Sequence, residues 1–184
     1  MSSLRHAMIL ALALLTASVS AYPGAVSGGD DPALARFVHL SKPQNLDNIA
    51  FVGPDGKPFE LEAFRGHPVM INLWATWCPP CVRELPSLMR FRQEFEAKGL
   101  KVAPVSIDRD TTKVAPFLEE LGMGEMKTWF DTSNQFGQIL PTDLIPATFI
   151  LDEHGQLVAF VRSFVDWDSP AVRQAMTRYL PEGQ

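Results

Sequence analysis

The run PVMINLWA at residues 68–75 has one polar side chain in eight positions, and it sets the tightest limit on the fold. A strand that is apolar on both faces has to be covered on both faces, as in a sheet with helices on either side. An amphipathic pattern follows, with apolar residues at helical spacing from Val82 to Phe95 and a glycine at position 99, where a helix cap belongs. A buried strand followed by such a helix predicts an α/β domain.

Extended and helical patterns alternate along the rest of the chain. Proline cannot donate to a strand ladder, so we expect Pro104, inside an apolar strand pattern, at a sheet edge or a bulge. The other predicted elements are a hairpin over 49–61 that turns at 54–56, a strand at 100–108, helices at 111–122 and 133–139, a hairpin over 147–161 that turns at 152–155, and a helix from 170 that Ser169 caps. They fit one mixed central sheet flanked by helices, with the first hairpin as an N-terminal extension.

The N-terminal region has a different character. Residues 1–21 combine a basic start at Arg5 with an apolar run of eleven residues and small residues before Ala21, which predicts a secretory signal peptide. An uncleaved membrane anchor is the alternative. Residues 22–43 contain many Gly, Ser, Asp and Pro residues and predict a flexible leader that ends in a short packed element. Residues 44–184 are then a single domain.

The charge balance argues against some classes of partner. The chain has 16 Lys and Arg residues against 21 Asp and Glu residues, a net charge of −5, and removal of residues 1–21 leaves −6 because Arg5 is lost. Such a balance argues against nucleic acid and anionic membrane surfaces as partners. Export places the cysteines of the chain in an oxidising compartment.

Both cysteines lie in the segment WATWCPPCVRELP, at positions 78 and 81. As a structural staple, the pair would close a loop of about four residues, which removes little entropy from the unfolded chain. A zinc site needs about four ligands. The histidines, at 6, 39, 67 and 154, have no paired spacing, so we expect no bound metal or other cofactor. Copper(I), which accepts two soft thiolates, stays open.

A reversible redox pair fits the local pattern. Cys78 falls between a buried strand and an amphipathic helix, so we expect it at a helix N-terminus, where N–H groups and the helix dipole lower the pKa of a thiol. Cys81 would lie one turn further along, within reach of Cys78 for a disulfide. Pro79 and Pro80 suit the first helical turn, where a missing N–H costs little.

The segment NLWATWCPPCVRELP resembles the active-site segment of the thioredoxin superfamily, in particular the TlpA-like and ResA-like extracytoplasmic thioredoxins. The likeness continues through DGKPFELEAFRGHPVMINLWATWC, LIPATFILDEHGQLV and DWDSPAVRQAM, and so spans roughly residues 46–180. This resemblance implies a thioredoxin fold and thiol–disulfide oxidoreductase activity.

The resemblance also implies which residues are catalytic. Cys78 would be the attacking thiolate and Cys81 the resolving thiol, joined as the redox disulfide in the oxidised protein. Pro146 stands where the family has a cis-proline that faces the cysteines. Glu84 matches a glutamate of the ResA and TlpA branches that can take and return the proton of the resolving thiol; a solvated helix residue is the alternative. Cytoplasmic thioredoxins instead carry a buried acid where this chain has Asn72.

An apolar rim around the motif is expected to bind the partner, because exposed apolar patches commonly mark contact sites. Its members are Trp77, Pro79, Pro80 and Ile145, and the backbone of Ile145 would pair with a partner strand. We expect Trp74 and Trp167 in the core.

Together these features predict a periplasmic protein-disulfide reductase. The resemblance implies electrons from a membrane thiol transporter and, as partners, the thiols of a copper chaperone, an oxidase subunit or an apocytochrome c. The cytochrome-maturation branch carries a glutamate after its cis-proline, where this chain has Ala147. A disulfide oxidase or isomerase and a non-enzymatic Cu(I)-binding module are the alternatives. We expect a monomer.

Overall fold

The computed structural model describes residues 32–139 and 144–181, and the predicted signal peptide lies outside the described residues. The strands are β1 (Val38–Asn45), β2 (Ala50–Val52), β3 (Pro58–Glu60), β4 (Val69–Trp74), β5 (Lys101–Ser106), β6 (Trp129–Phe130), β7 (Ala147–Leu151) and β8 (Gln156–Val161). The helices are α1 (Pro79–Glu96), α2 (Val114–Glu120), α3 (Phe136–Ile139) and α4 (Pro170–Met176), with 3-10 turns η1 (Leu34–Arg36), η2 (Leu61–Phe64), η3 (Thr111–Lys113) and η4 (Thr177–Tyr179).

The strands form one mixed sheet in the spatial order β1-β8-β7-β4-β5-β6-β2-β3. The apolar strand β4 is central: it pairs in parallel with β5 and antiparallel with β7, so that Leu73 lies opposite Val105 on one side and Ala147 on the other. Strands β2 and β3 form the predicted N-terminal hairpin, which joins the sheet where Val52 pairs with Phe130 of β6. The predicted mixed sheet is therefore confirmed, with strands β1 and β6 as additions.

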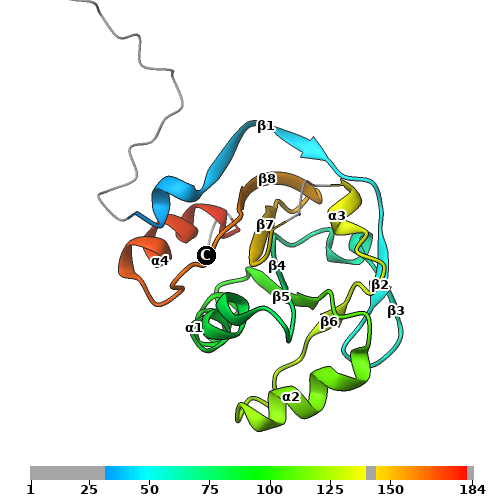
Figure 1. Cartoon of the computed structure of the whole chain (residues 1–184). Coiled ribbons are helices and arrows are strands. Elements are labelled where there is room, and N and C mark those ends of the chain that lie inside the picture. Colours follow the sequence, from blue (N-terminus) through cyan, green and yellow to red (C-terminus); the bar gives the residue numbers. More distant parts are fainter. Residues whose placement is uncertain (1–31, 140–143, 182–184) are drawn as a thin grey trace, which may run out of the picture.

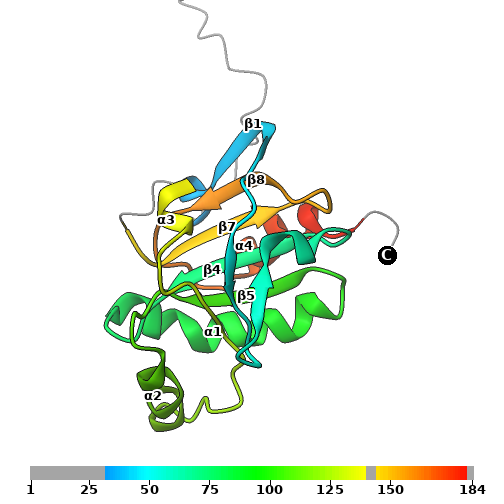
Figure 2. The ribbon, with the colours of Figure 1, turned by 90° about the vertical axis from the view of Figure 1, so that its right-hand side faces the viewer.

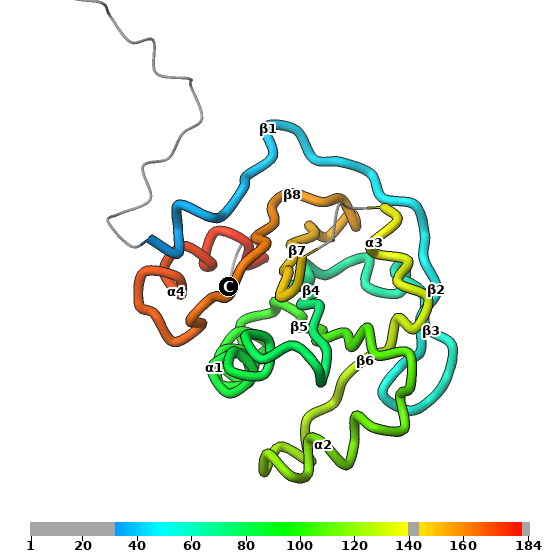
Figure 3. The backbone as a smooth tube through the Cα atoms, in the orientation of Figure 1, coloured from blue at the N-terminus to red at the C-terminus, as the bar shows by residue number. Residues whose placement is uncertain are grey.

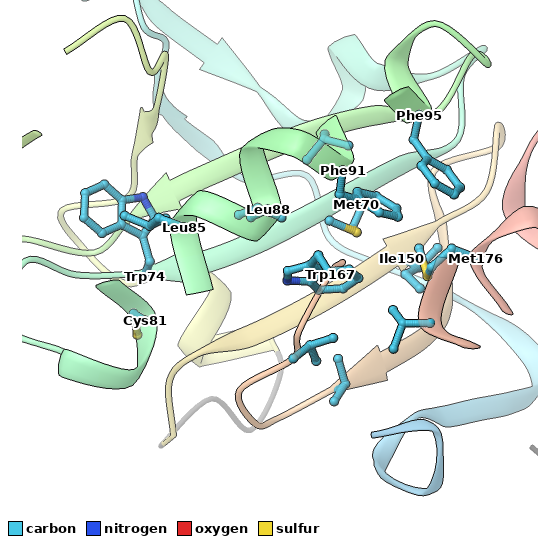
Figure 4. Packing of buried hydrophobic residues seen from close by; sticks show 14 of the residues in the cluster. Met70, Trp74, Cys81, Leu85, Leu88, Phe91, Phe95, Ile150, Trp167 and Met176 are labelled. Atoms are coloured by element: carbon cyan, nitrogen blue, oxygen red, sulfur yellow. The ribbon is translucent and has the colours of Figure 1, made fainter. Parts of the chain in front are cut away.

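Helices cover both faces of this sheet, which explains why β4 is apolar on both sides. In Figures 1 and 2, α1 and α4 lie on one face and α3 lies on the other. Of the two apolar clusters, the one on the α1 face is the larger. Figure 4 shows Trp167 among its side chains, and the ring centroid of Trp167 is 5.1 Å from that of Phe91. Trp74 and Trp167 are both fully buried, as predicted. Alternate residues of the central strands β4 and β7 thus fill two clusters, one on each face.

Pro104 is not in an edge strand, because β5 lies between β4 and β6. The expectation of a sheet edge or a bulge was wrong, because Pro104 also pairs in regular register with Asn72 of β4, but its physical reason holds locally. The carbonyl of Pro104 accepts a hydrogen bond from the hydroxyl of Thr128, which directly precedes β6. The backbone N and C=O groups of Pro104 therefore face the β6 side of the strand. The first β5–β6 pair is Val105 with Trp129, one residue later. The missing N–H of proline therefore falls just before the ladder begins.

The ordered domain begins before residue 44. Residues 34–36 form η1 and residues 38–45 form β1, which pairs antiparallel with β8, so part of the segment predicted as leader belongs to the sheet. Figure 3 shows this segment running from beside α4, past β8, to β2 and β3. Leu40 is the one residue of β1 that is not exposed. The strand therefore lacks the alternation of apolar and polar residues from which it could have been predicted. Across the described ranges, none of the helices combines the length and the apolar content needed to cross a bilayer.

Candidate active site

The two cysteines lie where the central strand β4 gives way to helix α1. Cys78 is the N-cap of α1, and its Sγ accepts a hydrogen bond from the backbone N–H of Cys81 at 3.3 Å. The two residues form a disulfide with an S–S distance of 2.04 Å and a Cα–Cα distance of 5.3 Å. Pro79 and Pro80 occupy the first two helical positions, where no intrahelical N–H bond is lost. An N–H group is thus already directed at the sulfur that would carry charge after reduction.

The chain segment around Pro146 lies against Cys78. The Ile145–Pro146 peptide bond is cis, as predicted. The Sγ of Cys78 is 3.8 Å from the carbonyl oxygen of Ile145, so the backbone just before the proline borders the disulfide. Cys78 keeps 4% of its surface exposed and Cys81 keeps 1%. Cys78 is thus the more exposed of the two cysteines, although both side chains are buried.

The predicted rim divides into exposed and half-buried members. Trp77 is 63% exposed and Pro79 is also exposed, whereas Pro80 and Ile145 are half-buried. Leu144, which directly precedes Ile145, is 59% exposed and was not predicted as part of the rim. Exposed apolar side chains therefore lie beside the cysteines in sequence and beside the segment that contacts Cys78.

Glu84 is buried inside the domain. It keeps 1% of its surface exposed, which contradicts the alternative of a solvated helix residue. Its Oε1 accepts hydrogen bonds from the Asn72 amide and from the indole N–H of Trp167, each at 2.8 Å. Its Oε2 accepts the backbone N–H of Val165 at 3.0 Å. One carboxyl group thus receives three donors, one from β4 and two from the loop that connects β8 to α4.

Burial dominates the electrostatics of this carboxyl. It raises the pKa of Glu84 from an ordinary 4.5 to about 7, against the three hydrogen bonds, which lower it. Glu84 follows Cys81 by three residues on α1, so the two side chains share a helix face. The site therefore places a carboxyl that changes protonation near neutral pH on the same face as the more deeply buried cysteine.

Two contributors to this network escaped sequence reasoning. Trp167 was expected only as a core residue, although a buried indole N–H needs an acceptor and Glu84 provides it. Asn72 was noted as the position of a buried acid in other thioredoxins, but not as a donor to Glu84. The Asn72 amide also lies 3.0 Å from the hydroxyl of Thr148 on β7, which fixes it across the sheet. Buried polar residues in an apolar strand were the available signal.

Asp108 anchors the turn that precedes Cys78. It is 5% exposed and accepts the backbone N–H of Thr76 at 3.0 Å and the Thr76 hydroxyl at 2.7 Å. The Ser106 hydroxyl donates to it as well, at 2.8 Å. A groove of about 900 Å³ runs beside this turn, lined by Trp77 together with Arg109. The Asp108 carboxyl group is thus occupied by hydrogen bonds to Thr76 and Ser106, and the turn that it stabilises places the exposed Trp77 beside the groove.

A metal site with three or more protein ligands has no support in the part of the chain that the structure describes. Those residues contain no group of three or more His, Cys, Asp or Glu side chains arranged to hold an ion.

Comparisons with known proteins agree with this geometry. The chain is 29% identical over 129 residues to the thiol:disulfide interchange protein DsbE of Vibrio cholerae, covering 70% of this chain and 68% of that protein. It is 26% identical over 122 residues to the thiol-disulfide oxidoreductase ResA of Bacillus subtilis, covering 66% and 68%.

Solved structures share the architecture. A candidate thiol:disulfide interchange protein DsbE from Chlorobium tepidum superposes with a TM-score of 0.63 at 26% identity, covering 76% of this chain and 95% of that one. A secreted thiol-disulfide isomerase from Corynebacterium glutamicum superposes with a TM-score of 0.66 at 21% identity, covering 82% and 93%, and supports the fold alone. The predicted thioredoxin fold is confirmed. The family model described as Redoxin matches residues 42–175, and the chain therefore belongs to the Redoxin family.

Proposed function

We propose that this chain is an extracytoplasmic thiol–disulfide oxidoreductase that reduces disulfides of partner proteins in the periplasm. The observation that carries the proposal is the disulfide at the start of α1, with Cys78 capping the helix and a buried carboxyl on the Cys81 face. The names of the DsbE and ResA relatives support the same chemistry. Residues 1–21 would direct export.

The reaction starts from the reduced dithiol. The Cys78 thiolate attacks one sulfur of the partner disulfide, and the other partner sulfur leaves as a thiolate that takes a proton from water. Cys81 then gives its proton to the Glu84 carboxylate and attacks the Cys78 sulfur, which releases the second partner thiolate. Two electrons pass to the partner, and the chain is left with the Cys78–Cys81 disulfide. A membrane thiol transporter would supply two electrons to restore the dithiol.

Partner binding would use the exposed rim. Trp77 and Pro79 offer apolar surface next to Cys78, and the groove beside Trp77 gives room for the residues that flank the partner cysteine. The backbone of Ile145, beside the Cys78 sulfur, would hydrogen-bond to an extended partner segment, with Pro146 holding it in place. Mixed apolar and backbone contacts suit a protein substrate rather than a small molecule.

The proposed partners are proteins whose thiols must be reduced to do their work. A copper chaperone or an oxidase subunit binds its metal only through thiolates, and an apocytochrome c needs free cysteines for haem attachment. Ala147 differs from the glutamate of the cytochrome-maturation branch, so copper-site assembly is the partner class we favour.

The test is a covalent trap. In the Cys81→Ser variant the resolving step is gone, so a mixed disulfide between Cys78 and an oxidised copper chaperone or an oxidised apocytochrome c peptide should accumulate. A Cys78→Ser/Cys81→Ser variant is the matched control and should trap neither. Failure of the single variant to form an adduct with any disulfide-bearing protein would contradict a transfer enzyme.

Two further measurements separate the alternatives. A reductase should have a reduction potential closer to the about −270 mV of thioredoxin than to the about −120 mV of a strong oxidant, and a value near the latter would favour the oxidase. Stoichiometric, tight Cu(I) binding by the reduced protein, together with no exchange activity, would favour the copper-binding module.

A further inference from the structure

Two of the three donors to Glu84 come from a segment without regular structure. Val165 and Trp167 lie in the loop at residues 162–169, between β8 and α4, whereas Asn72 lies in the centre of the sheet. A donor on a central strand is fixed by pairing on both sides. Donors on a loop depend on whatever holds that loop.

The N-terminal segment just before β1 holds one side of this loop. Arg36, at the end of η1, donates from Nη1 to the hydroxyl of Ser163 at 3.1 Å and to the carbonyl oxygen of Phe164 at 3.4 Å. Both acceptors directly precede Val165, whose N–H reaches Glu84. These bonds connect residues that are more than 120 positions apart in the sequence.

Phe37 packs directly on the second donor. Its ring meets the indole of Trp167 edge-on, with centroids 6.3 Å apart and an interplanar angle of 86°. Figure 1 shows this blue segment beside α4, on the same face of the sheet as α1. The contact covers the indole whose N–H donates to Glu84 at 2.8 Å.

We infer that Arg36 and Phe37 are positioning residues for the proton-transfer carboxyl, because they keep the Val165 N–H and the Trp167 indole N–H directed at Glu84. The inference rests on the proposed role of Glu84 in the function above. It means that the segment joining the leader to the domain is part of the active-site support.

Helix α1 supports the same loop from the opposite side. The Ser87 hydroxyl accepts the backbone N–H of Trp167 at 3.3 Å, and the guanidinium of Arg83 lies 4.6 Å from the ring centroid of Phe164. The charged side chains around the loop are Arg36 from η1, Arg83 and Arg90 from α1, Arg162, Asp166 and Asp168 of the loop itself, and Arg173 from α4. The pKa of Glu84, however, responds to burial and to its three hydrogen bonds.

The direction of the effect follows from these bonds. Hydrogen bonds to the ionised carboxylate favour it and lower its pKa, so a loop that withdraws its donors leaves burial less opposed and raises the pKa of Glu84. The carboxylate form needed to take the Cys81 proton then becomes populated only at higher pH. The pH profile of the resolving step should move upward with it.

The test uses the full chain with Arg36→Gln or Phe37→Leu, and matched controls on the far side of the sheet. Arg65→Gln removes an exposed arginine that pairs with Glu62, and Phe59→Leu shortens a half-buried ring in the other cluster. The readouts are the pKa of Glu84 from carboxyl NMR and the pH profile of mixed-disulfide resolution. Both variants should raise the pKa of Glu84 and the midpoint of the pH profile by about 0.5 pH unit or more, and both controls should leave the two values unchanged.

Equal midpoints in the variants and the controls would overturn the inference, even if thermal stability falls in all four proteins. Arg36→Gln changes an exposed side chain, so the test does not depend on a core substitution that fails to fold. The NMR readout also separates this inference from the proposed function. A resolution profile that is unchanged by Glu84→Gln would refute the role of Glu84, while a moved Glu84 midpoint in Arg36→Gln would still support the positioning.

Discussion

The first turns of α1 have two unlike sides. On the outer side, Cys78 caps the helix between the exposed Trp77 and Pro79. On the inner side, Cys81 and Glu84 are sealed, each with 1% of its surface exposed. In the proposed mechanism, this difference assigns recognition of the partner to the exposed side chains on either side of Cys78. The same mechanism assigns proton transfer to the interior, where burial raises the pKa of Glu84 to about 7.

The largest difference between the two sides is expected when the sulfur of Cys78 is removed. Cys78→Ser should reduce exchange with a partner disulfide to the uncatalysed level, because the inner Cys81 is shielded and cannot attack a protein substrate. Cys81→Ser should still consume one equivalent of partner by forming a mixed disulfide. Stopped-flow thiol exchange measures both. Comparable residual activity in the two variants would show that the sides are not functionally different.

The second test removes the inner carboxyl while keeping its shape. Glu84→Gln should slow resolution of the mixed disulfide about 100-fold at neutral pH, the lower range for loss of a general base, and leave the attack by Cys78 unchanged. Glu120→Gln, an exposed change on α2, is the control. If both steps slow equally, Glu84 supports the fold rather than the proton transfer.

The same variant tests the buried carboxyl through stability. Between pH 4.5 and about 7 the folded protein keeps the Glu84 proton that the unfolded chain has lost, so the unfolding free energy falls as pH rises. As pH rises over this window, the unfolding free energy of the oxidised Glu84→Gln protein should increase by about 3 kcal/mol relative to that of the unmodified chain. Urea unfolding at several pH values measures the difference. A constant difference across this range would mean that Glu84 has an ordinary pKa.

A smaller effect is expected at the outer rim. Trp77→Ala should raise KM for a protein partner several-fold, because the exposed indole is the largest apolar surface beside Cys78, with little change for a small-molecule disulfide. The unfolding free energy should change by less than about 0.5 kcal/mol. Leu121→Ala, another exposed apolar side chain, is the control. Equal effects on both substrates would place Trp77 outside partner recognition.

The outer side could largely be predicted from sequence, because it depends on local features. The cysteine spacing, the prolines of the first turn and the break between strand and helix are all contained within residues 68–86. The structure agrees that Cys78 caps α1 and that the bond before Pro146 is cis. Short-range patterns therefore sufficed for the cap, and the family resemblance for the cis-proline.

The inner side could be predicted only in part, because its contacts span the whole chain. Glu84 was found through the resemblance, but its donors Val165 and Trp167 lie about 80 residues away in sequence. Strand β1 was missed because edge exposure leaves it without an apolar alternation. Pro104 was misplaced because the pairing of β5 with β6, which begins at Val105, cannot be read from the β5 sequence. Tertiary pairing, rather than local pattern, determined each of these features.

The account depends most directly on the chemistry of the Cys78 sulfur. Its thiol pKa in the reduced protein can be measured by the pH dependence of alkylation in the Cys81→Ser variant. Because Cys78 caps a helix, we predict a pKa of about 7 or below and complete alkylation of the native protein. A midpoint at about 8.5, the value of an unperturbed thiol, or a sulfur that reacts only after unfolding, would contradict the account.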